Sequence, residues 1–552
     1  MTTTTRPAGR SGSTEDPPSG PAPALARRPA VAALLAGDSP VAALPPTTSR
    51  GRGRGAGRPI WAWSAALAVL VLCLVPVAFI VSAAGAAGWD VIAQVAWRPR
   101  VLELLGNTVL LALVVVPASV ALGLGAALLV ERCRVPRWLA IGFVAPLSVP
   151  AFVASYAWAT VWPSISGLSG AALVATLSYY PFVYLPVLGT LRRLDPDLEE
   201  SAAALGLTPL RTYARAVLPQ LRLPVLAGAL LVTLHLLAEY GAFAFVRFDT
   251  FTTAIYDQYK STFAGPAASV LAGVLVLLSL VVLGAEAAVR GRRRHVRLGG
   301  GTSRPPRRLA LGRWTLPLIL AVTALFAASL GVPAFALVRW LAVGTAWDDA
   351  VLAAVTTTLG YGAIGALVTC LAALPVVWLA VRHPSVWSRA LESATFVCSS
   401  LPGIVVGLAF VAWSIQFVPA VYQTSVVLLA AYVVLFLPRA VAGLRGGVAQ
   451  SSRALEETAQ TLGCTPATAL RRVTLPLLRP ALAGAFSLAF LGIAGELTAT
   501  LLLAPTGTTT LASRFWSLSS ELDYPGAAPY ALLLVALSVP MTALLFRRAD
   551  AT

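Results

Sequence analysis

Two glutamates stand inside apolar stretches at matching places in the chain. Glu239 lies in HLLAEYGAFAF and Glu496 in LGIAGELTATLLL, 257 positions further on. A charged side chain at the centre of a bilayer costs about 2.5–3.5 kcal/mol, so an acid within a hydrophobic span is a candidate functional residue. The carboxylate oxygens and the hydroxyl oxygen of the neighbouring Tyr240 are suitable ligands for a hard cation. We therefore take Glu239, Tyr240 and Glu496 as candidates for lining a pathway or an outer vestibule. The competing interpretation is an acid solvated at the membrane rim.

The remaining side chains that could do chemistry are dispersed along the chain. No CxxC pair occurs among the cysteines, which are Cys73, Cys133, Cys370, Cys398 and Cys464, and the histidines are His235, His295 and His383. His235 precedes Glu239 by one helical turn, and we expect a hydrogen-bonded histidine there rather than a ligand. We predict no disulfide framework, no zinc site, no catalytic residue and no cofactor in this chain.

The chain has one lysine, Lys260, among 41 basic residues. A Walker A loop needs a lysine after a glycine-rich run to bind nucleotide phosphates. Lys260 lies in DQYKST, which no such run precedes. We therefore expect no nucleotide-binding site in this chain, so that any ATP hydrolysis would take place in another protein.

The candidate residues must be positioned by membrane-spanning helices. Hydrophobic residues make up 57% of the chain and charged residues 12%, whereas soluble domains carry about 25% charged residues. A spanning helix needs about 20 apolar residues. By this criterion we predict an all-α polytopic membrane protein with twelve spans, at 60–82, 104–130, 138–162, 170–191, 218–246, 266–289, 314–338, 353–381, 390–415, 421–444, 475–504 and 528–546.

The distribution of basic residues predicts the orientation. With the N-terminus inside, only six basic residues fall in outer segments: Arg98, Arg100, Arg247, Lys260, Arg339 and Arg514. Since cytoplasmic loops carry an excess of Lys and Arg, we expect both termini in the cytoplasm. The net charge of +18 is then a signal of topology, and no nucleic-acid partner is predicted.

The chain divides into two repeated halves. We predict a disordered cytoplasmic tail at 1–59, a first half at 60–290, a basic linker at 291–313, a second half at 314–548, and a short tail at 549–552. Each half begins inside and contains six predicted spans, which makes the halves parallel pseudo-symmetric repeats.

The sharpest repeat lies between the fourth and fifth spans of each half. LEESAAALGLTPLRTYARAVLP (198–219) aligns with LEETAQTLGCTPATALRRVTLP (455–476) at an offset of 257. The composition predicts a short helix, a turn at the glycine, and a second helix capped by Thr208 or Thr465 with proline at its first position. An amphipathic helix resting on lipid headgroups is the alternative explanation.

This doubled segment resembles the EAA motif of ABC-importer permeases. The matching residues are Glu200, Ala202, Gly206 and Pro219 in the first copy, and Glu457, Ala459, Gly463 and Pro476 in the second. Three positions depart from the usual pattern: Ser201, Ala216 and Thr458. The resemblance implies that these segments are coupling helices that dock on two cytoplasmic ATPase subunits, and that a solute-binding protein outside the membrane delivers the cargo.

The region from about 60 to 547 resembles fused ferric-iron permeases, most closely over Gly495–Ser538 and Ala238–Phe263. The resemblance implies an importer subunit without an ATPase site, which works by alternating access, and ferric iron as the cargo. Thiamine, phosphonate and polyamine remain alternative cargoes. A secondary transporter is one rival class, but it would not need two docking helices. A membrane enzyme is another, but it would need a cluster of catalytic groups, and the candidate groups here are dispersed.

Overall fold

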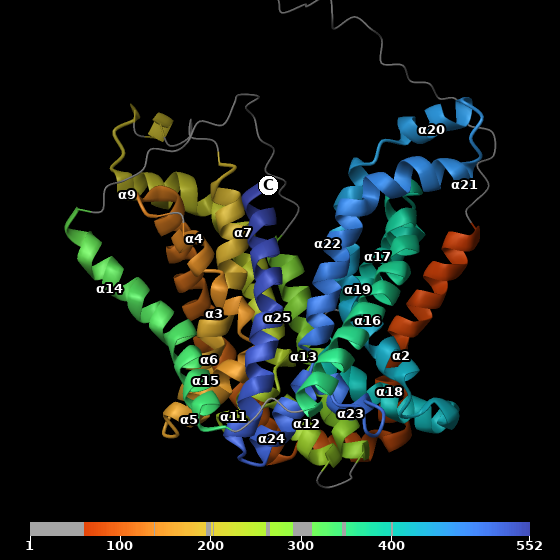
Figure 1. Ribbon diagram of the computed structural model, residues 1–552, viewed down its shortest axis with the longest axis horizontal. Helices are drawn as coiled ribbons and strands as arrows, with labels where there is room; N and C mark the ends of the chain where they lie inside the picture. The colour runs from red at the N-terminus through yellow and green to blue at the C-terminus, as the bar shows by residue number, and fades with distance from the viewer. Residues whose placement is uncertain are drawn as a thin grey trace, which may run out of the picture. The chain divides into compact units, whose positions relative to one another are not determined.

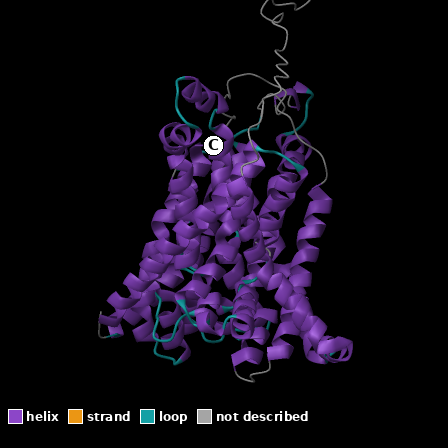
Figure 2. Cartoon of the chain, turned by 90° about the vertical axis from the view of Figure 1, so that its right-hand side faces the viewer, coloured by secondary structure: helices purple, strands orange, loops and turns teal. Residues whose placement is uncertain are grey.

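The computed structural model describes residues 60–551 except 137, 195–199, 203, 261–264, 291–311, 345–348 and 399–400. In these residues the secondary structure is helical, without a strand (Figure 2). The predicted tail at 1–59 and nearly all of the predicted linker lie outside the described residues. Ile60–Thr552 form one compact unit.

The first half of the sequence contains long helices interrupted by short ones (Figure 1). The helices in chain order are α2 (Ile60–Ala96), α3 (Pro99–Arg132), α4 (Trp138–Gly142), η2 (Ala145–Ser148), α5 (Ala151–Val161), α6 (Gly167–Tyr179), α7 (Pro181–Leu191), α9 (Pro209–Thr212), η3 (Tyr213–Val217), η4 (Leu218–Leu221), α10 (Arg222–Ala238), α11 (Gly241–Phe245), α12 (Phe251–Lys260) and α13 (Gly265–Arg290).

The second half repeats this order with small differences. It contains η5 (Gly312–Trp314), α14 (Thr315–Phe326), η6 (Ala327–Gly331), α15 (Val332–Val343), α16 (Asp349–Arg382), α17 (Val386–Cys398), α18 (Gly403–Phe417), η7 (Pro419–Val421), α19 (Ser425–Gln450), α20 (Arg453–Thr461), α21 (Pro466–Ala469), η8 (Leu470–Thr474), α22 (Leu475–Ala494), α23 (Thr498–Leu503), α24 (Leu511–Ser520) and α25 (Tyr524–Ala551).

The all-α polytopic fold is confirmed, and among the described residues nine helices are long and apolar enough to cross a membrane, or ten if the bent pair α17 and α18 forms one span. The prediction of twelve differs at 138–162, 390–415 and 528–546. The first of these is broken into α4, η2 and α5, and the second bends by 102° between α17 and α18. The third lies in α25, which continues to Ala551 but has its apolar part at Tyr524–Pro540.

Proline explains the first two breaks. Pro150 and Pro402 precede α5 and α18 with extended ψ angles of 141° and 143°. A proline cannot donate a backbone hydrogen bond and its ring clashes with the preceding helical turn, so it favours the end of a helix, although Pro117 and Pro375 lie inside α3 and α16. The motifs SVP and SLP carry this break in both halves. Apolar content predicts one span in each region because it takes no account of the backbone N–H donor that a proline lacks.

The fifth and eleventh predicted spans also break, at the two glutamates. Helix α10 ends at Ala238 and α11 begins at Gly241, while α22 ends at Ala494 and α23 begins at Thr498. Glu239 has φ −75° and ψ 127°, which is extended backbone. At membrane depth, non-helical backbone is tolerated only where protein or a water-filled cavity surrounds it. The breaks therefore indicate an interior site.

The first helix of each half packs against the other half. Helix α2 contacts α16, α17 and α18 of the second half in addition to α13 of its own half, and α15 contacts α5 of the first half in addition to α25 of its own half. One apolar core combines residues of α2, α12 and α13 with α16–α19 and α22, and the other combines α3, α5–α7 and α10 with α15, α24 and α25. The halves are repeats in sequence, but they are not separate packing units.

Small residues make the close helix contacts. On α2, Ala62, Ala66 and Cys73 are buried while Leu67 and Val71 are exposed. In lipid, large apolar side chains gain little by facing another helix, whereas small ones let backbones approach. The surface of α2 that faces the second half is therefore the one with the smaller side chains.

Candidate functional site

Each candidate glutamate accepts a hydrogen bond from the first turn of the short helix that follows it. Glu239 Oε1 accepts from the Ala242 amide at 2.9 Å, and Glu496 Oε1 accepts from the Ala499 amide at 2.8 Å. A carboxylate suits a helix N-terminus because that end exposes unpaired amides and a partial positive charge. The two halves thus repeat this interaction three residues beyond each glutamate.

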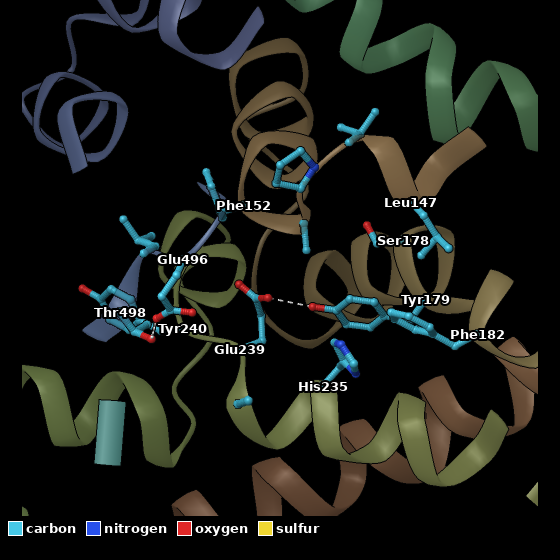
Figure 3. Close-up of a pocket in the computed structure, with 17 residues that line it drawn as sticks. Leu147, Phe152, Ser178, Tyr179, Phe182, His235, Glu239, Tyr240, Glu496 and Thr498 are labelled. Atoms are coloured by element: carbon cyan, nitrogen blue, oxygen red, sulfur yellow. Dashed lines mark hydrogen bonds between the residues drawn. The ribbon is translucent and has the colours of Figure 1, made fainter. Parts of the chain in front are cut away.

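The two glutamates have different second partners. Glu239 Oε2 accepts a hydrogen bond from the Tyr179 hydroxyl at 2.7 Å (Figure 3). Glu496 Oε1 accepts from the Thr498 hydroxyl at 2.8 Å. Burying a charged carboxylate away from water costs free energy, and hydrogen bonds of this kind offset part of that cost.

Both glutamates line two adjoining cavities. The first, about 230 Å³, is lined by residues of η2, α5, α6 and α10 together with Glu239 and Glu496. The second, about 420 Å³, is lined by residues of α10, α17, α18 and α19 together with the same two glutamates. The cavities are counterparts under the repeat, because Ser178 and Tyr179 of the first correspond to Leu435 and Phe436 of the second. This interior placement favours a pathway over an acid solvated at the rim.

Tyr240 was predicted to line a pathway, but its ring packs mainly against other aromatic side chains. It borders the first cavity, but its ring packs at 4.6 Å from Tyr256 and at 5.1 Å from Trp516 between centroids. Its residue is only 4% exposed. Tyr240 therefore joins α11 to α12 and α24.

His235 is hydrogen-bonded, as the sequence predicted, and it also faces both cavities. Its Nδ1 donates to the Leu231 carbonyl oxygen at 2.8 Å. Its ring lies 4.3 Å from that of Phe182 and 5.6 Å from that of Tyr179 (Figure 3). Within the described residues, no three His, Cys, Asp or Glu side chains lie close enough to hold a metal ion.

Arg439 is a cavity residue that the sequence analysis missed. It lies within α19 and lines the second cavity with Glu239 and Glu496. The available signal was a single arginine inside the predicted span 421–444. The distribution of basic residues predicts topology, but an arginine inside a span also requires a functional or structural reason of its own.

The acids of the outer loops have local partners. Asp249 accepts from Arg100 at 2.6 Å, Glu521 accepts from Ser517 at 3.0 Å, and Asp523 accepts from the Gly526 amide at 2.9 Å. Asp257 differs, because burial and then the nearby charge of Asp249 raise its pKa. Most of these acids therefore stabilise the loops in which they lie.

Both doubled segments lie at one end of the helices, and α5, α11, α12 and α24 lie at the other (Figure 1). In each copy a helical turn ends at a glycine with positive φ, 77° at Gly206 and 90° at Gly463. The amides of Leu207 and Cys464 then bond back to Ala202 and Ala459 at 3.2 and 3.0 Å. This is the Schellman ending, in which a left-handed glycine closes the helix. The predicted helix, turn and helix are present.

The second helix of each segment begins at the predicted proline. Helices α9 and α21 start at Pro209 and Pro466, and Thr465 Oγ1 accepts from the Thr468 amide at 3.3 Å. A π-helical turn follows at Tyr213–Val217 and at Leu470–Thr474, 257 residues apart. Each lies directly before the Leu-Pro pair, because a proline removes the donor that would continue the α-helical ladder.

Both doubled segments expose an acid and a large apolar side chain. Glu200 and Glu457 are exposed, and the nearest cation to Glu457 is Arg453 Nε at 3.8 Å. Leu205 and Leu462, which directly precede the glycines, are 83% and 81% exposed. Sequence reasoning did not select these leucines. Exposed apolar side chains at equivalent positions of a repeat are typical of a contact surface.

A partly buried ion pair ties the second segment to the membrane helices. Arg382, the last residue of α16, donates to Glu456 Oε1 at 2.8 Å, and the side chains are 9% and 16% exposed. Thr474 donates to the same oxygen at 2.8 Å, and Arg382 also donates to Ser451 at 3.1 Å. In the first half Arg132, the last residue of α3, lies over the Tyr213 ring at 5.9 Å. The ends of α3 and α16 are therefore joined to the doubled segments.

Comparison with known proteins gives the same architecture. Residues 95–295 and 376–547 match the family "Binding-protein-dependent transport system inner membrane component". The chain is 36% identical over 473 residues to the "Fe(3+)-transport system permease protein FbpB 2" of Haemophilus influenzae, covering 84% of this chain and 93% of that protein. It is 24% identical to the "Ferric transport system permease protein FbpB" of Actinobacillus pleuropneumoniae, over 69% of this chain and 58% of that one. A "Putative 2-aminoethylphosphonate transport system permease protein PhnV" of Salmonella typhimurium is 33% identical over 36% of this chain and 72% of its own length.

Proposed function

Because this chain belongs to the family of inner membrane components of binding-protein-dependent transport systems, we propose that it imports ferric iron, driven by separate ATPase subunits. It is a multi-pass inner membrane permease whose single chain contains the family's domain twice. The proposal on cargo is supported by the relative that covers most of both chains, whose name specifies Fe(3+) transport.

The two doubled segments are the surfaces on which the ATPases would dock. Glu200 and Glu457, with Leu205 and Leu462, are exposed at the same end of the helices. The C-terminus is drawn at this end as well (Figure 1). Together with the predicted excess of basic residues, this supports a cytoplasmic position for the doubled segments and both termini. The solute-binding protein would then contact the end that carries α5, α12 and α24.

The paired cavities are the proposed path of the cargo. ATP binding would close the ATPases, move the docking segments, and through them reorient the two sets of helices around Glu239 and Glu496. This is alternating access about a site between repeated halves. The carboxylate oxygens of Glu239 and Glu496, which line both cavities, suit a hard trivalent cation.

The proposal is tested by purification and uptake. Tagged chain, extracted in detergent from the membranes of its own organism, should retain an ATPase of separate sequence. With that ATPase and the partner binding protein in proteoliposomes, uptake of ⁵⁵Fe(III) should exceed uptake of thiamine, 2-aminoethylphosphonate and polyamine. Preferential uptake of another cargo would overturn the assignment of iron alone, whereas uptake independent of ATP would favour a secondary transporter.

Charge reversal tests the docking surfaces. The double variant Glu200→Arg and Glu457→Arg should lose both ATPase retention and uptake while still inserting in the membrane. Glu521→Arg reverses an exposed acid that directly follows α24 and is the control for ATPase retention, which it should leave unchanged. ATPase retention at the control level by the double variant would contradict docking through these segments.

A further inference from the structure

The two cavities are related by the repeat, yet their chemistry differs. At an offset of 257, three residues of the first cavity correspond to three residues of the second half that carry other side chains. Tyr179 corresponds to Phe436, Phe182 to Arg439 and His235 to Gly492. The glutamates themselves are retained in both halves, so the symmetry is lost only in the side chains around them.

Arg439 occupies the space that His235 fills in the first cavity. A Cβ added to Gly492 would lie 2.5 Å from Arg439 Nη1. The guanidinium also lies over the Phe436 ring, at 5.1 Å from its centroid. A glycine at position 492 of α22 therefore creates the groove in which the arginine rests.

The guanidinium faces the cavity and is not paired with an acid. Arg439 is exposed although it lies in the middle part of α19, since it borders the cavity that contains Glu239 and Glu496. Among the described residues no carboxylate comes within 4.0 Å of it. Of the described side chains that line the two cavities, Arg439 alone is an arginine or lysine.

Arg439, Glu239 and Glu496 line one cavity, and charges interact more strongly where protein replaces water. Arginine keeps its charge at all physiological pH values. A cation that approaches the two glutamates would therefore also meet repulsion from Arg439.

We propose that Arg439 is a tethered cation that competes with the cargo cation for Glu239 and Glu496. It rests in the Gly492 groove, and from there its positive charge offsets part of the negative charge that would otherwise hold the cargo. The carboxylates then never hold the cargo as strongly as they would alone, and release toward the docking segments is favoured. This inference rests on the proposed transport of a cation through the cavities.

Retention of metal by the purified complex measures this competition. Gallium(III), supplied as its nitrilotriacetate chelate, serves as a redox-inert probe for a trivalent cation. Arg439→Gln should retain more gallium than the unchanged protein, by a factor on the order of five or more, and should take up ⁵⁵Fe(III) more slowly. Arg439→Lys, which keeps the charge, should lie close to the unchanged protein in both measurements.

Arg339→Gln, at an exposed position of α15 outside both cavities, is the control and should change neither quantity. The inference is overturned if Arg439→Gln retains no more gallium than the control. Reduced retention would also overturn it, because the guanidinium would then hold an anion that accompanies the metal. If Arg439→Lys behaves as Arg439→Gln does, the charge is not the cause and the inference fails.

The failure of this inference can be distinguished from failure of the proposed path. Glu239→Gln together with Glu496→Gln should abolish most uptake in the same assay. If it does so while Arg439→Gln resembles the control, only the tethered cation is wrong. If the double glutamine variant transports normally, the cavities are not the path and the proposed route itself is wrong.

Discussion

At the scale of single residues, the two glutamates combine a structural and a chemical role. Each ends a break in a long apolar helix by accepting an amide hydrogen bond from the next helix, and each leaves its carboxylate at the cavity. The energy spent on an acid at this depth is partly offset by those fixed donors. A site built this way can present negative charge without a dedicated metal cage.

Arg382 provides the sharpest prediction at this scale. Arg382→Met leaves Glu456 without its cation, and removal of one partner of a buried ion pair costs about 3–5 kcal/mol. We expect uptake to fall strongly while ATP hydrolysis continues, because α20, which we propose docks on an ATPase, is no longer held to α16. Uptake and ATPase rates measured on the same proteoliposomes separate these effects.

A second substitution shows whether the broken ion pair causes the loss of uptake. Arg382→Met combined with Glu456→Gln should recover part of the lost uptake, because no uncompensated carboxylate remains. Arg389→Met, at an exposed arginine of α17 that bonds within its own helix, is the control. Equal loss in the single and double variants would show that the ion pair does not couple the two elements.

At the scale of elements, glycines set how closely helices approach. A Cβ at Gly123 of α3 would lie 2.8 Å from the Tyr180 carbonyl oxygen and 2.9 Å from the Tyr184 amide nitrogen. These are backbone atoms, which cannot turn aside as a side chain can. Two residues further along the same helix, nothing lies within 4 Å of a Cβ added to Gly125.

This pair of glycines predicts stability changes of opposite sign. Gly123→Ala should lower the free energy of unfolding by about 1–3 kcal/mol because it overpacks α3 against α7. Gly125→Ala should raise it slightly, by about 0.5–1 kcal/mol, since alanine loses less entropy in a helix. Thermal unfolding in detergent measures both, and a Gly123→Ala variant as stable as Gly125→Ala would contradict the close approach.

At the scale of the whole molecule, the exchange of first helices joins the halves. Helix α2 packs on α16–α18 and α15 packs on α5, so each apolar core needs residues of both halves. In the proposed transport cycle, each first helix would therefore have to keep or exchange contacts with helices of both halves.

Cutting the chain between Gly300 and Gly301 tests this arrangement. The two pieces, expressed together, should copurify and restore uptake, because the contacts of α2 and α15 do not need the peptide link. Either piece alone should be degraded or aggregate, since its first helix lacks its partner. Size-exclusion chromatography of a piece expressed alone decides the matter: a stable monodisperse half would show that the exchange is dispensable.

The sequence by itself determined the apolar helices, the repeat and the form of the docking segments. Apolar runs, a left-handed glycine and proline at a first helical position are local requirements, and the doubled motif met all of them at Gly206 and Gly463. The pairing of Glu239 with Glu496 at one cavity also followed from their equal places in the repeat.

Only the tertiary structure decided where spans break, which half each first helix joins, and that Arg439 faces the glutamates. In lipid, shape and close packing determine which helices contact one another, and hydrophobic pattern does not. The role of a small residue such as Gly492 therefore depends on the side chain that packs against it. The space at Gly492 and the arginine within it come from α22 and α19, so no local pattern in either helix could have predicted their contact.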